Sequence, residues 1–359
     1  MRHDWKIRIR EDEATRVDSA RLLDLVARCY VALGLEEDAA REAAGVLVEA
    51  DLLGKETHGV PLFAGYVANL RNGLWNPRPR ISIVKDTPNT ALVDGDGGPG
   101  ANVGRYAMAL AIQKAQEHAV GVVTVRNSRH FGASGIYAQM ALAHHQIGIA
   151  MTNASPQVAP TFGAAPRFGT NPIAVAAPAA NGRYWALDMA TSTVPHNRTT
   201  LAARLGRTMP AGWMTDTDGN PVTDPKAPRE GRLLLPLGSS PEMSSHKGYG
   251  LAVWVDIMCG VLSGHGFGLQ LTRGQVGHFF AAIDIEAFIP IDTFTAMMDQ
   301  MLDDLRSTPP LPGEDRVFYA SEEEQETLAD RRANGIPLHA STLQQLKTIA
   351  DELEVAYDL

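Results

Sequence analysis

The chain has little cysteine, with only Cys29 and Cys259 in 359 residues. Both lie among apolar residues in segments that we expect to be helical, so we interpret them as core residues and not as redox groups. Such a low cysteine content is typical of a reducing compartment, and we expect a cytoplasmic location. No apolar run reaches the roughly 18 residues that span a bilayer, and the first residues, MRHDWKIRIREDEATR, are too charged for a secretory signal.

Basic residues are also in deficit, because 32 lysines and arginines are set against 41 acidic residues, for a net charge of -9. This balance argues against a nucleic-acid surface, although it says little about local sites for small anions. The sequence also lacks histidine spacings typical of a metal site. His144 and His145 are adjacent and would point about 100° apart on a helix. We therefore expect no nucleic-acid, membrane or metal partner.

One stretch, residues 122–178, places polar side chains directly after strand-like runs. A β-branched run over 122–125 stops at a polar tetrad, Asn127, Ser128, Arg129 and His130. A helix of small residues is predicted over about 132–145, and a second apolar run over 147–151 ends in Thr152 and Asn153. Polar groups at strand ends, beside small residues that allow close approach of the backbone, favour a ligand cleft in an α/β protein.

A second candidate site lies nearer the N-terminus, where helices predicted over 18–34 and 36–53 lead into a glycine-flanked turn. This turn carries His58, and a third helix is predicted to begin at Pro61 and to include Tyr66. Taken alone, a histidine at a helix start is more often a solvated or capping residue. Histidine nevertheless suits proton transfer, because its pKa lies near working pH. His58 and His130 are therefore the two candidates for an acid/base.

The run Gly95–Gly100, GDGGPG, formally matches the G-x-G-x-x-G pattern of a dinucleotide-binding turn. That pattern requires an acidic residue about 20 positions further on, at the end of the next strand. The next strand is instead followed by Arg126, Asn127 and Ser128, and Pro99 stiffens the turn. We favour a structural strand-to-helix turn over a phosphate-binding loop.

The remaining segments predict helical ends around a β-rich middle. Strands are expected at about 81–84, 90–93, 184–189 and 276–283, and helices over 291–306, 321–334 and 341–353. The polar, proline-rich and glycine-rich segment 206–245 is interpreted as an ordered surface excursion that covers a cofactor or a partner subunit. The apolar helix after it, 251–262, is expected to be buried. The pattern favours a mixed α/β fold.

Several motifs in order along the chain, THGV, NSRHFGASGIYA, GTNPIAVAAP, LDMATS and HKGYGLAVWVDIMCGVLSG, resemble the malate/L-lactate dehydrogenase family of the second, non-Rossmann type. That family includes ureidoglycolate dehydrogenases, diketogulonate reductases, sulfolactate dehydrogenases and cyclic-imine reductases. The resemblance implies a non-Rossmann α/β fold with a β-rich cofactor domain over 76–290. It also implies a helical domain built from both termini, 1–75 and 291–359, and a homodimer with a shared active site.

The resemblance further implies an NAD or NADP cofactor and a set of site residues. His130, His58 and Asp188 would be catalytic, with His130 slightly ahead as proton donor and acceptor, and Thr57, Tyr66 and Arg129 would bind substrate. Cofactor contacts would come from Thr152, Asn153, Ala154, Asp188, Met189, Ala190, Thr191, Ser192, Lys247, Gly248, Ser321 and Glu322. From its position at a strand end alone, Asp188 would either orient a histidine or cap the following helix.

Three places depart from the pattern of this family. Leu62 replaces an arginine that can grip a substrate carboxylate, residues 320–322 replace a Pro-Gly-Glu-like turn, and residues 195–198 replace a run containing glycine and lysine. We expect hydride transfer between a nicotinamide and a 2-hydroxy acid/2-oxo acid pair. Reduction of a cyclic 2-imino acid is the near alternative, and a catalytically inactive nucleotide-binding homologue is the alternative from another class.

Overall fold

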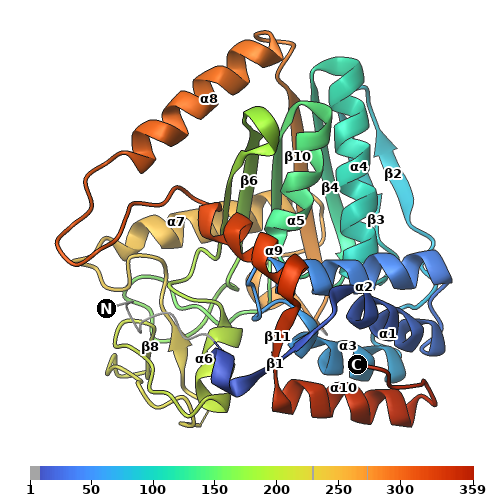
Figure 1. Ribbon diagram of the computed structural model, residues 1–359, viewed down its shortest axis with the longest axis vertical. Coiled ribbons are helices and arrows are strands. Elements are labelled where there is room, and N and C mark those ends of the chain that lie inside the picture. The colour runs from blue at the N-terminus through green and yellow to red at the C-terminus, as the bar shows by residue number, and fades with distance from the viewer. Residues whose placement is uncertain (1–8, 229, 273) are drawn as a thin grey trace.

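The computed structural model describes residues 9–228, 230–272 and 274–359, so the first eight residues of the charged leader lie outside it (Figure 1). Its centre is a mixed seven-stranded sheet in the order β2–β3–β4–β10–β5–β6–β7. The strands are β2 Ser82–Asp86, β3 Thr90–Asp94, β4 Val120–Ser128, β5 Gln146–Thr152, β6 Ile173–Pro178, β7 Tyr184–Met189 and β10 Val276–Asp284. β3 and β4 pair in parallel, and the other neighbours in this sheet pair antiparallel.

The strand register collects several chain segments at one end of this sheet. It sets Ser128 opposite Val276, Thr152 opposite His278, and Met189 opposite Ile173. Since β4, β5 and β7 all end there, the polar residues that follow each strand are brought to the same edge. The mixed α/β fold predicted from the sequence is confirmed, and this edge is where the site forms.

Helices cover both faces of the sheet. α4 (Gly100–His118) and α5 (Ser134–Met140) pack on one face, and α7 (Ser245–Asp256) with the π-helical turn η5 (Ile257–Val261) packs on the other. Glycines in the strands permit this close packing. A Cβ on Gly121 would lie 1.9 Å from the Ala111 carbonyl oxygen, and one on Gly148 would lie 2.0 Å from that of Ala138.

The two ends of the chain lie side by side, as the blue and red elements in Figure 1 show. α1 (Ser19–Ala32) and α3 (Phe63–Arg71) contact α10 (Ala340–Glu352), and α2 (Glu37–Leu52) contacts α9 (Glu322–Asn334). β1 (Ala14–Val17) pairs antiparallel with β11 (Ile336–His339). This ribbon was not expected, because its strands are four residues long and neither shows a clear alternation.

Two helices leave large apolar side chains exposed. The expectation that helix 251–262 is buried is wrong, because Val253, Trp254, Ile257, Val261 and Leu262 are all more than a third exposed, at 38–55%. α8 (Ile291–Arg306) projects from the body in Figure 1, contacts the turn η4 (Ala180–Gly182), and buries only Leu302. Both helices therefore present apolar faces that nothing in this single chain covers, within the residues described.

The excursion over 206–245 is ordered around a small core of its own. Met209, Trp213, Met214 and Leu234 are buried there against Val158 and Phe168, and the short strands β8 (Met214–Thr215) and β9 (Leu233–Leu234) pair. α6 (His196–Arg204) packs beside it through Leu201 and Ala202. In the described part of the chain, no helix combines the length and the apolar character needed to cross a membrane.

Candidate active site

Two histidines that are far apart in the sequence lie face to face at the strand-end edge. His130 follows β4, and His58 lies in the turn between α2 and the 3-10 turn η2 (Val60–Leu62). Their ring centroids are 6.0 Å apart and the ring planes differ by 14°. Both side chains are partly exposed, so a ligand can reach them. The structure therefore brings together the two residues that the sequence offered as acid/base candidates.

His130 is held by one hydroxyl and by aromatic packing behind it. The Tyr66 hydroxyl lies 2.5 Å from His130 Nδ1, and the Gly132 backbone nitrogen lies 3.4 Å from the same ring nitrogen. The neighbouring Phe131 is buried between the rings of Tyr137 and His278, with centroid distances of 4.7 and 4.6 Å. Nδ1 is engaged, so Nε2 is the nitrogen through which this ring can act.

His58 is held in a similar way by the residue before it. The Thr57 hydroxyl lies 2.9 Å from His58 Nδ1, and the Asn197 side-chain amide donates to the Thr57 carbonyl oxygen over 2.9 Å. Thr57 and Tyr66 therefore each orient a histidine. Their contact with a substrate stays a prediction.

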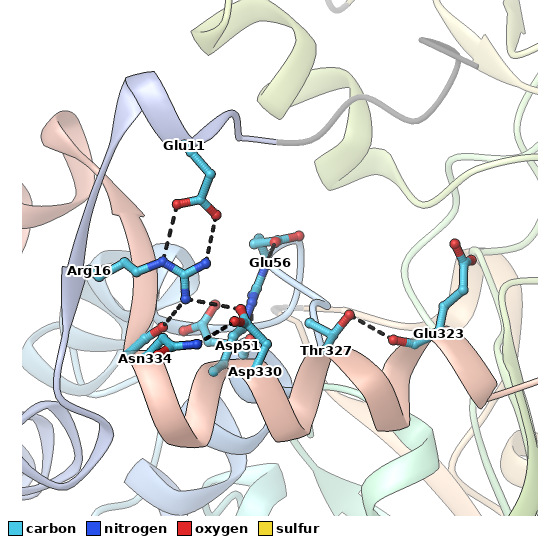
Figure 2. A network of polar contacts seen from close by, with 10 residues as sticks. Glu11, Arg16, Asp51, Glu56, Glu323, Thr327, Asp330 and Asn334 are labelled. Carbon is cyan, nitrogen blue, oxygen red and sulfur yellow. Dashed lines mark hydrogen bonds and ion pairs between the residues drawn. The ribbon is translucent and has the colours of Figure 1, made fainter. Parts of the chain in front are cut away.

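Charged groups fasten the turn that carries His58 (Figure 2). Arg331 of α9 pairs with the buried Glu56 at 2.6 Å and donates to the backbone carbonyl of Asp51. The Asp51 carboxyl group in turn accepts the Val60 N–H over 2.8 Å, and Gly59 has no room for a Cβ, which would lie 1.9 Å from Asp51 Oδ1. The C-terminal helix thus supports the segment that presents His58.

Arg16 extends this network along α9, as Figure 2 shows. It pairs with Asp330 at 3.0 Å and with Glu11 at 2.8 Å, and Asp330 also accepts from the Asn334 amide. These outer groups are partly exposed, so removing one partner should cost less than removing a partner of the buried Glu56–Arg331 pair.

Asp188, at the end of β7, faces the same space as His58 but bonds to another residue. Its Oδ2 lies 2.9 Å from Lys55 Nζ. Burial acts to raise the pKa of Asp188, but the charge and hydrogen bond of Lys55 outweigh it, so the pKa lies below its ordinary value. Asp188 is therefore an anion paired with a cation, next to a neutral imidazole.

Both histidines are uncharged at neutral pH. Burial lowers the pKa of His58 to about 4; the Asp188 carboxylate opposes this shift, and Lys55 and Arg198 add to it. Burial, and then the neighbouring His58, lowers the pKa of His130 to about 3. Burial also raises the pKa of Tyr66, so its hydroxyl stays protonated beside His130. An uncharged imidazole can accept a proton from a bound hydroxyl group.

The side chains expected to contact the cofactor at the ends of β5 and β7 bond within the protein. The Thr152 hydroxyl lies 2.8 Å from His278 Nδ1, and Asn153 accepts the Gly277 N–H over 2.8 Å. Thr191 donates to the Asn171 carbonyl over 3.0 Å, and Ser192 donates to that of Val194 over 2.7 Å. These side chains shape the edge on which Ala154, Met189 and Ala190 also lie. Cofactor contact at these residues stays a prediction.

Four other expected cofactor residues lie on different elements. Lys247 is exposed in the first turn of α7, and Gly248 packs so closely that a Cβ would lie 2.4 Å from the backbone of Leu237. Ser321 accepts the Ala186 N–H over 3.1 Å beside β7, and Glu322 pairs with Arg306 at 3.0 Å. Across the three described ranges, no hydrogen bond or ion pair joins these four residues to the two histidines.

Arg129, the residue before His130, lines a cavity next to the site. This cavity of about 440 Å³ is lined by Gly73, Leu74, Trp75, Asn76, Pro77, Asp96, Gly97, Asn127 and Arg129. Trp75 packs on Tyr66 with ring centroids 4.6 Å apart, and the Tyr66 ring lies 5.9 Å from that of His130. The glycine-rich turn beside it leads into α4, where a Cβ on Gly100 would lie 2.0 Å from the Arg129 carbonyl oxygen. The chain itself occupies the start of this helix, which agrees with the structural interpretation of the GDGGPG run.

Three residues that support this site were not expected from the sequence. Lys55 occupies an ordinary-looking turn, Asn197 sits in a polar run, and His278 lies inside a β-branched and aromatic strand. His278 is fully buried, with Ser128 and Thr152 hydroxyls 2.8 Å from its two ring nitrogens. A histidine in a central strand was the one available signal, because burial of that side chain requires two partners.

Comparison with known proteins identifies relatives that match nearly the whole chain. The family model described as malate/L-lactate dehydrogenase matches residues 17–347. A malate dehydrogenase of Pyrococcus horikoshii is 40% identical over 351 residues, covering 96% of this chain and 97% of that protein. The crystal structure of malate dehydrogenase from Entamoeba histolytica superposes with a TM-score of 0.94 at 34% identity, covering 96% of this chain and 100% of that one.

A more distant structure, delta1-piperideine-2-carboxylate reductase from Pseudomonas syringae pvar. tomato, shares the fold. It superposes with a TM-score of 0.81 at 27% identity and covers 94% of this chain and 100% of its own. The order of motifs, the strand arrangement and these matches agree with one another. The chain belongs to the malate/L-lactate dehydrogenase family.

Proposed function

We propose that this chain interconverts a 2-hydroxy acid and a 2-oxo acid with NAD or NADP, using His130 and His58 as its proton-transferring groups. The observation that carries this proposal is the pair of parallel imidazoles, 6.0 Å apart, built from two distant segments at the strand-end edge. Family membership supports the reaction class, since the relative from Pyrococcus horikoshii is named a malate dehydrogenase.

The nicotinamide, when bound, supplies or accepts the hydride, and the chain has to manage the proton. In the oxidation direction, the uncharged Nε2 of His130 takes the proton of the substrate hydroxyl. Nε2 can take this proton only in the tautomer that carries its hydrogen on Nδ1, and the Tyr66 hydroxyl, 2.5 Å away, accepts this Nδ1–H before and after the transfer. In the reverse direction the charged ring returns the proton from Nε2 and keeps its Nδ1–H on the Tyr66 oxygen, so Tyr66 acts as the acceptor that fixes this tautomer.

The charges around the histidines fit anionic ligands. Lys55 and Arg198 act on His58, Arg129 precedes His130 in the chain, and Asp188 is the carboxylate among them. Lys55 is paired with Asp188 and Arg331 with Glu56, and Arg198 and Arg129 are two further guanidinium groups near the histidines, in a chain whose overall charge is -9. Both a substrate carboxylate and the phosphates of a dinucleotide would be stabilised there. Lys247 and Gly248 at the start of α7 are proposed to meet the charged part of the cofactor.

A homodimer accounts for the apolar faces that the single chain leaves exposed. One face is formed by Trp254, Ile257, Val261 and Leu262 of α7 and η5, and the other by Met297, Met301 and Leu305 of α8, which are 41–63% exposed. Contiguous exposed apolar surface of this kind marks a protein–protein interface. We propose that two copies bury these faces against each other, and size-exclusion chromatography with light scattering tests the stoichiometry.

Turnover is tested by nicotinamide absorbance with NADH and NADPH against a panel of 2-oxo acids, and in reverse with 2-hydroxy acids. Oxidation of either reduced cofactor by a 2-oxo acid is the expected result. If nicotinamide binds, as fluorescence would show, but no acid or imine supports turnover, the inactive-homologue alternative replaces this proposal.

Reduction of a cyclic 2-imino acid is the second candidate, favoured by the shared fold of the piperideine-carboxylate reductase. Leu62 supports it further, because the turn next to His58 offers an apolar side chain to a ring. Higher kcat/KM for a cyclic imine than for every 2-oxo acid in the same panel would establish this candidate over the first.

A further inference from the structure

Lys55 and Asp188 form a largely buried ion pair beside His58. Lys55 Nζ lies 2.9 Å from Asp188 Oδ2, and the two side chains are 19% and 13% exposed. Asp188 is also confined on its other side, because a Cβ on Gly135 would lie 2.8 Å from the same oxygen. The carboxylate is therefore fixed between the end of α2 and the start of α5, and it faces His58 without bonding to it.

We propose that Lys55 is a positioning residue that holds the Asp188 carboxylate and cancels its charge, so that His58 stays an uncharged proton acceptor between turnovers. The importance of this role for catalysis rests on the proposed function. Its physical content, a cation that governs the charge of a neighbouring imidazole, is independent of the substrate.

Among the charged groups around His58, Lys55 decides whether the ring carries a proton. The Asp188 carboxylate on β7 favours a proton on the His58 ring, whereas Lys55 and Arg198 of α6 disfavour one. His130 faces it from after β4 as a second uncharged ring. Without Lys55, the buried carboxylate would lose the cation that contacts it, and it would then draw a proton onto His58. An opposite charge within about 4–6 Å typically moves a pKa by 1–3 units.

Lys55 itself stays charged in this setting. Burial acts to lower its pKa, but Asp188 and then Glu324 of α9 outweigh burial, and the pKa lies above its ordinary value. A group that keeps its proton throughout the working range cannot relay one. Lys55 therefore acts through Asp188 and His58, and we assign it no proton transfer.

The test is an NMR titration of the His58 ring in full-length protein labelled at histidine, with the His58→Asn spectrum as assignment. Lys55→Met should raise the His58 titration midpoint by roughly one unit or more, and Lys55→Arg should leave it near the wild-type value. Lys347→Met is the matched control, because it removes an exposed lysine paired with Asp351 at 2.8 Å on α10. An unmoved midpoint in folded Lys55→Met overturns the proposal.

Two further variants keep the proposal testable if Lys55→Met does not fold. Asp188→Asn should leave the midpoint unchanged or lower it, and the double variant Lys55→Met/Asp188→Asn should titrate close to wild type. A raised midpoint in Asp188→Asn would overturn the proposal. The acid limb of kcat/KM for hydroxy-acid oxidation should move to higher pH in Lys55→Met and stay in place in Lys55→Arg.

These readouts separate the two proposals. If no substrate is turned over but the ring titrations follow the pattern above, the proposed reaction fails and the role of Lys55 in setting charge stands. If turnover occurs and the ring midpoint does not respond to Lys55, the reaction stands and the role of Lys55 fails.

Discussion

The turn that carries His58 and the turn that carries His130 present similar rings but are supported by different forces. Ion pairs and buried carboxylates hold the first, through Glu56 with Arg331 and Lys55 with Asp188. Aromatic stacking holds the second, with Phe131 between Tyr137 and His278. Paired charges lose their compensation when a single partner is removed, whereas apolar packing loses free energy in proportion to the volume deleted. The His58 turn is therefore the part of the site most sensitive to charge and pH.

The largest effect is expected from variants that remove the two imidazole rings. His130→Ala and His58→Ala should each lower turnover by about 10² or more, because general acid–base catalysis is lost, while nicotinamide affinity should change little. Steady-state kinetics and cofactor titration measure the two effects. If only His130→Ala loses activity, then His58 has a supporting role, and the difference between the turns extends to function. Full activity in both variants would contradict the assignment.

The second prediction tests the ionic support of the His58 turn. Arg331→Met should destabilise the fold by about 3 kcal/mol, because it leaves Glu56, which is 8% exposed, as a buried charge without its partner. Chemical denaturation measures this loss. The double variant Arg331→Met/Glu56→Gln should recover most of it, and Arg316→Met, which breaks an exposed pair with Glu326, is the matched control. Equal losses in the single and double variants would show that packing holds the turn.

The third prediction concerns pH and the carboxyl group under the same turn. Burial raises the pKa of Asp51 to about 8, with the Val60 N–H opposing this shift. The folded state therefore binds a proton that the unfolded state releases near pH 4, so stability should fall as pH rises from about 4 and should level off above about 8. Asp51→Asn should abolish this loss, which amounts to about 2 °C in Tm between pH 7 and pH 9 for a chain of this length. Asp218→Asn, at an exposed turn, should keep the wild-type slope, and a slope retained in Asp51→Asn would refute the argument.

The regular elements and the position of the site were within reach of the sequence. The strands and helices follow the apolar periodicity, and α1 begins where Asp18 accepts the Arg21 N–H as its N-cap. The register that joins the ends of β4, β5 and β7 follows from which strands pair. Polar residues after buried runs were therefore a sound guide to the edge where His130 lies.

The residues and contacts that support the site could not be predicted from the sequence in the same way. Lys55 and Arg331 carry no local signal of burial, and each meets its partner across more than 100 positions of sequence. The exposure of α7 was missed because an apolar run indicates burial without specifying whether the covering surface belongs to the same chain. β1 and β11 pair from opposite ends of the chain and are too short for periodicity to reveal.

The smallest effect is expected from a variant that adds one more charge beside the His58 turn. Leu62 ends η2, four residues after His58, and packs partly against the main core. Leu62→Arg should raise kcat/KM for small 2-oxo acids by up to about tenfold, because a guanidinium can hold a carboxylate through two hydrogen bonds, less the cost of losing apolar contact. Leu62→Met is the control, since it keeps the size and adds no charge. If both variants behave alike, another cation near the site, such as Arg198, holds the carboxylate.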